Sequence, residues 1–186
     1  SNQAQYDGAP EEVKRPPAPG HPYDWLDLQY ADFYAVAAPE LGEHVVYLEW
    51  RRGDGEISRQ RLWVFREDDD GLASGMDFFT FRDAAPYAGR GAEAGAFADI
   101  TREALIGYPQ GCTLQPHADP ARGLQFEVSP EDCRITARSG REMGIFAAIR
   151  FEADAIEYSE AGILPDGNYA FLVPGGMAYA FRRLED

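Results

Sequence analysis

Short segments with an apolar residue at every second position recur along almost the whole chain, and turn signals separate them. This spacing is typical of β-strands that bury one face. The strands expected in the first half of the chain span residues 28–36, 43–51, 57–66 and 76–81. Gly53-Asp54-Gly55 and the run Asp68-Asp69-Asp70-Gly71 supply turns between them. The first half is therefore predicted to form a β-meander of antiparallel strands.

After one interruption, the second half repeats this pattern. Residues 83–107 are rich in Ala and Gly, and residues 99–106 are predicted to form a short helix with Asp99 as its N-cap. The strands expected after it span residues 112–115, 124–128, 134–138, 145–151, 156–159, 169–173 and 178–183. Turns are expected at Ser139-Gly140, Asp166-Gly167 and Pro174-Gly175-Gly176.

About ten short strands with one or two short helices predict a mostly β fold, either an antiparallel barrel or a sandwich. We favour a single antiparallel β-barrel, because a closed sheet of this size has an interior that can hold a ligand. No internal repeat or linker divides the chain, so residues 1–186 are expected to form one domain. Residues 1–22, rich in Pro, Glu and basic side chains, are expected to form an irregular, exposed N-terminal arm.

Composition and charge exclude several classes of function. A chain of 186 residues that is 45% hydrophobic can bury a core. Its formal net charge of −15 would repel nucleic acid and anionic membranes, and no run of basic residues offsets it. No apolar run approaches the roughly 20 residues that span a bilayer. We therefore expect a soluble protein whose partners include neither nucleic acid nor a membrane.

The chain lacks the common motifs of nucleophilic, phosphate-binding and metal-dependent catalysis. It has no serine-histidine-aspartate order and no phosphate loop. The three histidines, His21, His44 and His117, do not have the spacing of a zinc motif. The run Asp68–Asp70 lacks the spacing of a calcium loop and is typical of a charged hairpin turn. No metal site is expected.

Two cysteines, Cys112 and Cys133, lie on either side of one predicted strand. In an oxidising compartment they would form a structural disulfide that stabilises the fold by roughly 3 kcal/mol. In a reducing compartment they would be two buried thiols. Both alternatives are structural, because no histidine lies close enough in the sequence to serve as a catalytic base for either thiol.

Several short motifs follow one another in a characteristic order. They are Ser1-Asn2-Gln3-Ala4-Gln5, Val46-Tyr47-Leu48-Glu49-Trp50, Arg59-Gln60-Arg61-Leu62-Trp63, Phe81-Arg82-Asp83, Tyr87-Ala88-Gly89, Tyr108-Pro109-Gln110-Gly111-Cys112, Cys133-Arg134-Ile135, Asp166-Gly167-Asn168-Tyr169 and Pro174-Gly175-Gly176. In this order they resemble the motifs of the T-type phycobiliprotein lyases, the CpcT/CpeT chromophore lyase family. The first motif is similar to the end of that family's G-x-F-S-N-x-x-Q element, which implies a chain that is incomplete at its N-terminus.

The resemblance implies a calycin-like, lipocalin-like antiparallel barrel. It also implies a lyase that binds a linear tetrapyrrole (a phycobilin) and attaches it to a cysteine of a phycobiliprotein β subunit. The new thioether forms on the client's cysteine, so no cofactor is required and the phycobilin is the ligand and substrate. A true lyase would be cytoplasmic, whereas a chain that has lost an export signal would be periplasmic. A homodimer is compatible with the sequence.

Polar residues of the second and third expected strands are the main candidate site. We expect Tyr47, Glu49, Arg59 and Arg61 to share a face inside the barrel, where buried polar groups must be paired. In one alternative, Glu49 pairs with either arginine and the cluster is a structural plug. In the other, Arg59 and Arg61 grip the two propionates of a bilin. In that second role, Glu49 or Asp77 would be the catalytic carboxylate that hydrogen-bonds the pyrrole nitrogens, and Tyr47 and Trp63 would be stacking walls.

Asn2 and Gln5, from the opening motif, either bind at the rim of the barrel or satisfy backbone groups. Two further functions compete with the lyase. The barrel could bind another small hydrophobic, carboxylated ligand without catalysis, in an organism without phycobilisomes. It could also be filled with side chains and bind nothing.

Overall fold

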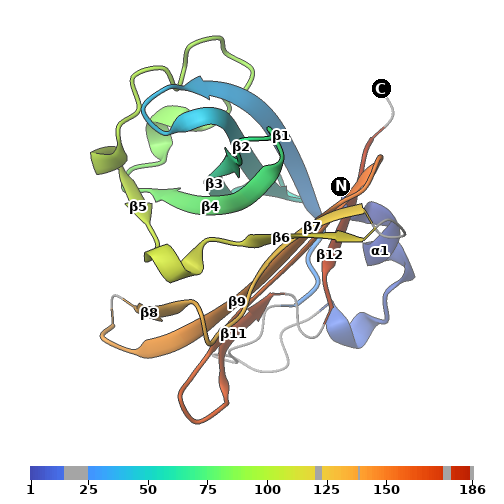
Figure 1. Ribbon diagram of the computed structural model, residues 1–186. Helices are drawn as coiled ribbons and strands as arrows, with labels where there is room; N and C mark the ends of the chain where they lie inside the picture. The colour runs from blue at the N-terminus through green and yellow to red at the C-terminus, as the bar shows by residue number, and fades with distance from the viewer. Residues whose placement is uncertain (15–24, 120–122, 138, 174–176, 185–186) are drawn as a thin grey trace. The chain divides into compact units, whose positions relative to one another are not determined.

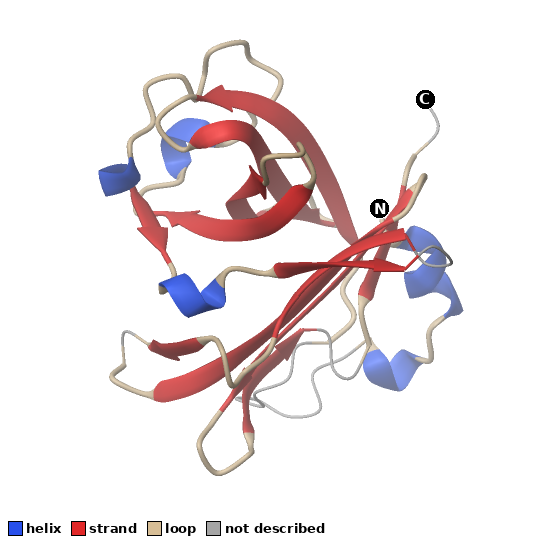
Figure 2. Ribbon diagram, viewed as in Figure 1, coloured by secondary structure: helices blue, strands red, loops and turns tan. Residues whose placement is uncertain are grey.

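The computed structural model describes residues 1–14, 25–119, 123–137, 139–173 and 177–184 (Figure 1). These residues are mostly β, with two antiparallel sheets and few helices, all of them short (Figure 2). The chain divides into two compact units, and each is described by itself. The central unit is Tyr30–Tyr108, and the terminal unit combines Ser1–Gln29 with Pro109–Asp186.

A five-stranded sheet makes up most of the central unit. Its strands follow the order β1 (Gln29–Ala38), β2 (Gly42–Arg52), β3 (Ile57–Glu67), β4 (Ala73–Phe81) and β5 (Leu105–Gly107). The predicted meander is confirmed, since neighbouring strands pair antiparallel. The predicted turn between β2 and β3 is confirmed too. Gly55 adopts a left-handed φ of 91° there, a conformation that glycine adopts without strain.

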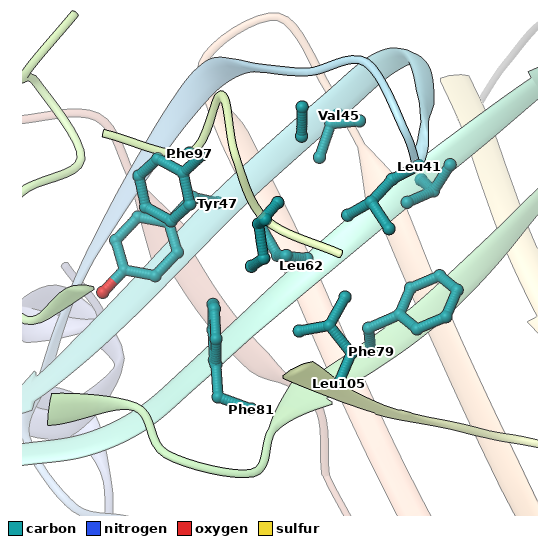
Figure 3. Packing of buried hydrophobic residues seen from close by; sticks show 11 residues of the cluster. Leu41, Val45, Tyr47, Leu62, Phe79, Phe81, Phe97 and Leu105 are labelled. Carbon is teal, nitrogen blue, oxygen red and sulfur yellow. The ribbon is translucent and has the colours of Figure 1, made fainter. Parts of the chain in front are cut away.

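One face of this sheet carries the hydrophobic core of the central unit. The side chains of Leu62, Phe79, Phe81 and Leu105 converge on it (Figure 3). Phe97 also packs there, with its ring 4.7 Å from that of Tyr47. Burial of these apolar side chains is the main force that holds the unit together.

The helix predicted over residues 99–106 is wrong. The segment instead forms a short 3₁₀ turn, η3 (Arg102–Ala104), and then enters β5, while Thr101 rather than Asp99 precedes the turn. Leu105 pairs with Phe81 in the sheet and is only 2% exposed. Tertiary pairing with β4 therefore overrides the local helical tendency of this segment. A further 3₁₀ turn, η2 (Ala85–Tyr87), lies earlier in the same connection.

Seven strands form the sheet of the terminal unit. They are β6 (Gln115–Asp119), β7 (Gly123–Val128), β8 (Arg134–Thr136), β9 (Glu142–Phe151), β10 (Ala155–Ile163), β11 (Tyr169–Val173) and β12 (Tyr179–Arg182). The main path runs β11-β10-β9-β7-β6, while β8 pairs with β9 and β12 pairs with β10. The predicted strand over 112–115 is wrong, because η4 (Gln110–Cys112) occupies its start and β6 begins at Gln115. Pro116 is tolerated in β6, which is an edge strand.

The N-terminal segment is more ordered than the irregular arm that we expected. It forms α1 (Gln3–Gly8) and η1 (Glu11–Val13), and the side chain of Asn2 is completely buried. The rest of the expected arm, residues 15–22, and the turn expected at residues 174–176 lie outside the described residues.

The two sheets confirm the mostly β, antiparallel fold with few short helices. No closed barrel is found among the described residues, so the single barrel and the single domain stay predictions. Within the same residues, no helix is long and apolar enough to cross a membrane.

Candidate functional site

The candidate residues of β2 and β3 lie on two opposite faces of the central sheet. Residues directly opposite each other in an antiparallel pair point to the same side. Glu49 lies opposite Gln60, whereas Arg59 lies opposite Trp50 and Arg61 lies opposite Leu48. The prediction that Tyr47 and Glu49 share a face with the two arginines is therefore wrong.

A β-bulge explains this error. Next to the turn, Arg51 lies opposite Ile57, but Trp50 lies opposite Arg59, so Ser58 is an extra residue in β3. Without that extra residue, continuing the pairing from the turn would place Arg59 opposite Glu49. One added residue moves every later side chain of the strand to the other face.

Tyr47 and Glu49 lie on the face that carries the hydrophobic core, and both side chains are almost fully buried. The Tyr47 hydroxyl donates a hydrogen bond to Glu49 Oε2 at 2.8 Å, and the backbone N–H of Gly89 donates to the same oxygen at 2.7 Å. Arg51 forms an ion pair with Glu49 Oε1 and bonds Asp32 at 2.8 Å. Glu49 is therefore paired with an arginine of its own strand, neither Arg59 nor Arg61.

The Tyr47 hydroxyl also ties the connection after β4 to the sheet. Gln60 Nε2 donates to Tyr47 Oη at 2.8 Å and to the carbonyl oxygen of Ala84 at 3.1 Å. Burial and the bond to the Glu49 carboxylate raise the pKa of Tyr47 well above its ordinary value. Burial and the nearby Asp32 carboxylate raise the pKa of Tyr34. Both phenols are therefore held in the neutral form, and the Tyr47 hydroxyl serves as a hydrogen-bond donor.

Asp77 does not join Glu49. It lies opposite Val64, four residues along β3 from the partner of Glu49, which is roughly 13 Å at the rise of a β-strand. Its carboxylate binds Arg66 at 2.6 Å. Glu49 and Asp77, the two alternative catalytic carboxylates, are therefore separate, and each has an arginine partner.

The other face of the sheet combines aromatic and guanidinium side chains. We call it the aromatic–arginine face, and it consists of Phe33, Trp50, Arg59, Arg61, Trp63 and Phe78. The Arg59 guanidinium lies over the Trp50 ring, 4.8 Å from its centroid. The Trp63 ring lies 5.4 Å from that of Phe33 and 6.3 Å from that of Phe78. Trp50 and Trp63 are only 2% and 1% exposed, whereas the other four side chains of this face are partly exposed. The partly exposed arginines and phenylalanines can bind carboxylates and stack planar groups.

Sequence reasoning found three members of this face and missed its other three. Arg59, Arg61 and Trp63 were predicted as ligand-binding residues. The alternation of β2 places Trp50 and Glu49 on different faces. Once the bulge is known, Trp50 therefore shares a face with Arg59. Phe33 and Phe78 come from β1 and β4, and only the order and pairing of the strands bring them to Trp63.

Asn2 and Gln5 satisfy backbone groups of the terminal unit. Asn2 Oδ1 accepts from the N–H of Gln29 at 2.8 Å, and its Nδ2 donates to the carbonyl oxygen of Asp27 at 2.9 Å. Gln5 Nε2 donates to the carbonyl oxygen of Ala178 at 2.7 Å, and its Oε1 accepts from the N–H of Ala180 at 3.0 Å. These contacts attach the N-terminal segment to the sheet.

Cys112 and Cys133 form a disulfide in the terminal unit, and both are buried. The bond joins η4 to the residue that precedes β8. Within the described residues, no group of three or more His, Cys, Asp and Glu side chains could hold a metal ion.

Comparison with known proteins shows a shared fold. The solved structure of the CRL protein of Arabidopsis is similar to this chain. Its TM-score is 0.60 at 16% sequence identity, and the match covers 84% of this chain and 82% of the CRL chain. At this identity the likeness concerns the fold alone. No protein-family model and no curated protein matches the chain.

Proposed function

We propose that the aromatic–arginine face binds a linear tetrapyrrole and that the protein acts as a chromophore lyase of the T type. The observation that carries the proposal is the placement of Arg59 and Arg61 on one face, beside Trp50 and Trp63. Two residues along a strand separate the arginines, so their Cα atoms lie roughly 7 Å apart. A bilin combines a long conjugated body with two propionates, and this face offers a partner for each part.

Each group on this face has a distinct role in the proposal. The guanidinium forks of Arg59 and Arg61 bind the propionates, and each charge-assisted bond contributes roughly 1.5–3 kcal/mol. The partly exposed rings of Phe33 and Phe78 stack on the pyrroles, and the buried Trp63 ring packs against both of them. Tyr47 and Glu49 point to the other face, so they stabilise the sheet instead of touching the chromophore.

The proposed lyase reaction requires positioning more than acid–base chemistry. The client's thiolate adds to the outer carbon of the ethylidene group of the bilin, the C=C π bond opens, and the ring carbon takes up the proton that the thiol released to solvent. The new thioether bond therefore belongs to the client. A rigid sheet that holds the bilin in an extended shape supplies orientation, which lowers the barrier for this step. This fits a face with aromatic and arginine side chains but no adjacent nucleophile and base.

Titration with phycocyanobilin, followed by visible absorption, tests the binding step. We expect a red-shifted, narrowed band with the native protein, and a loss of affinity of about tenfold or more for Arg59→Ala and for Arg61→Ala. Arg66→Ala is the matched control, because Arg66 lies on the same strand and pairs with Asp77. Unchanged affinity in both arginine variants would exclude this face as the binding site.

Addition of a phycobiliprotein β subunit tests the transfer step. A lyase should produce colour on the client that survives denaturation, and Arg61→Ala should slow its appearance. Bilin binding without covalent transfer would instead support the alternative, a non-catalytic binder of carboxylated ligands. Absence of any spectral change would favour a sheet that binds no such ligand.

A further inference from the structure

A groove in the terminal unit is lined by none of the candidate catalytic or ligand-binding residues. It encloses about 330 Å³ between the β8–β9 hairpin and the turn that follows β10. Ile163, Leu164 and Pro165 form an apolar wall, and Arg134, Glu131 and Glu142 also line the groove. This volume is at the small end of pockets that bind organic ligands.

The middle of the groove depends on a glycine. Gly144 lies between Arg134 of β8 and Ile163 of β10 in the sheet. A Cβ atom at position 144 would lie 2.4 Å from the carbonyl oxygen of Pro130, so a larger residue would displace this part of the lining. Glycine therefore lets the Pro130 backbone approach β9 closely.

The charged residues of the groove are placed for a ligand that carries both charges. Arg134 lies opposite Gly144, and Glu142 lies opposite Thr136, so Arg134 and Glu142 are diagonal neighbours on one face. Residues in such a pair are about 7–8 Å apart, and their Cβ atoms are somewhat closer. Neither side chain forms an ion pair with any other described residue. A guanidinium and a carboxylate with a gap between them match the carboxylate and ammonium of a zwitterion.

We propose that this groove binds a zwitterionic small molecule of the α-amino-acid class with an apolar side chain. Arg134 binds the carboxylate, Glu142 binds the ammonium group, and the wall of Ile163 and Leu164 receives the side chain. This proposal uses residues of the terminal unit alone, so it does not depend on the function proposed for the aromatic–arginine face.

The disulfide keeps the lining in place before a ligand arrives. Cys133 directly precedes Arg134, and its carbonyl oxygen accepts a hydrogen bond from Ile145 at 2.8 Å. The other cysteine of the disulfide, Cys112, lies in η4, and η4 closely approaches the segment before β8. A Cβ atom at Gly111 would lie only 2.4 Å from the carbonyl oxygen of Asp132. A preorganised site loses less conformational entropy when it binds.

Isothermal titration calorimetry of the full chain with L-leucine tests the proposal. We expect saturable binding to the native protein and a loss of affinity of about tenfold or more in Arg134→Ala. Arg182→Ala is the matched control, since Arg182 is an exposed arginine of the same sheet that faces Asp154. Binding that is absent in the native protein, or equal in Arg134→Ala, overturns the proposal.

Two blocked probes separate a free amino acid from the end of a peptide. N-acetyl-L-leucine lacks the ammonium group and L-leucinamide lacks the carboxylate. Weak binding of both supports a zwitterion and assigns the site to free amino acids. Binding of either blocked probe as tight as that of L-leucine overturns recognition of the zwitterion and assigns the site to one terminus of a peptide. Glu142→Gln should weaken the binding of L-leucine but leave the affinity for N-acetyl-L-leucine unchanged.

Discussion

The two faces of the β2–β3 ribbon use charged residues in opposite ways. On the core face, Glu49 accepts from Tyr47, Gly89 and Arg51, all within the central unit. On the aromatic–arginine face, the Arg59 guanidinium lies against a tryptophan ring. A buried charge with a complete set of internal partners stabilises the fold. Guanidinium groups beside aromatic rings suit recognition of a ligand, and this difference can be tested residue by residue.

Deletion of Ser58 should have the largest effect, because it removes the bulge that separates the two faces. The deletion would move Arg59 and Arg61 onto the core face and cost about 4 kcal/mol or more of the free energy of unfolding. Urea denaturation measures this loss. Ser58→Ala keeps the chain length and should cost about 1 kcal/mol or less. Similar stability of the two variants would contradict the role of the bulge.

Glu49→Ala should lower the free energy of unfolding by about 3 kcal/mol. It leaves the Tyr47 hydroxyl and the Gly89 N–H without their acceptor, and this breaks a buried pair. We place the value at the low end for such pairs, because the Arg51 side chain is 35% exposed. Glu56→Ala, in the exposed pair with Arg52, is the control and should change stability by about 0.5 kcal/mol or less. A small effect of Glu49→Ala would show that the core face tolerates loss of its network.

Ionisation of Tyr47 should lower the free energy of unfolding at alkaline pH. Its folded-state pKa is raised above the ordinary value of 10.0, so the folded state keeps the phenolic proton when the unfolded state has lost it. This contribution is complete below pH 10 and is lost as the pH rises from there towards the folded-state pKa. Urea denaturation at several pH values should show a shallower decline in Tyr47→Phe. The exposed Tyr169→Phe is the control, and an equally steep decline in Tyr47→Phe would contradict the prediction.

Asp77→Asn should lower the free energy of unfolding by only about 1 kcal/mol or less. The Asp77 carboxylate pairs with Arg66, whose side chain is half exposed, and such pairs contribute little. Chemical denaturation gives the stability, and phycocyanobilin titration gives the affinity, which should not change. Reduced bilin affinity in Asp77→Asn would instead support contact between this carboxylate and the bilin.

Arg61→Ala should have the smallest effect on folding, about 0.5 kcal/mol. Its guanidinium bonds the carbonyl oxygen of Gln60 at a long distance of 3.4 Å. The contrast with Glu49 is the point of the measurement, since Arg61→Ala should weaken bilin binding while Glu49→Gln should not. Weaker bilin binding in Glu49→Gln, with unchanged binding in Arg61→Ala, would assign bilin binding to the core face instead.

Local patterns were sufficient to predict most strands. The alternation of residues 43–51 and 57–66 gave the correct split of side chains within each strand, and Gly53-Asp54-Gly55 gave the turn. The helix expected at residues 99–106 failed, because its residues pair with β4. The state of Cys112 and Cys133 was left open, since sequence does not report whether two sulfur atoms are in contact.

By itself, the sequence determined which residues of one strand point the same way, because a β-strand repeats every two residues whatever surrounds it. The tertiary structure decided which residues of neighbouring strands share a face, since that depends on register. A single unpaired residue, Ser58, reverses the register between β2 and β3. Whether such a residue bulges or pairs is decided by the packing of both faces at once, and no local pattern contains that information.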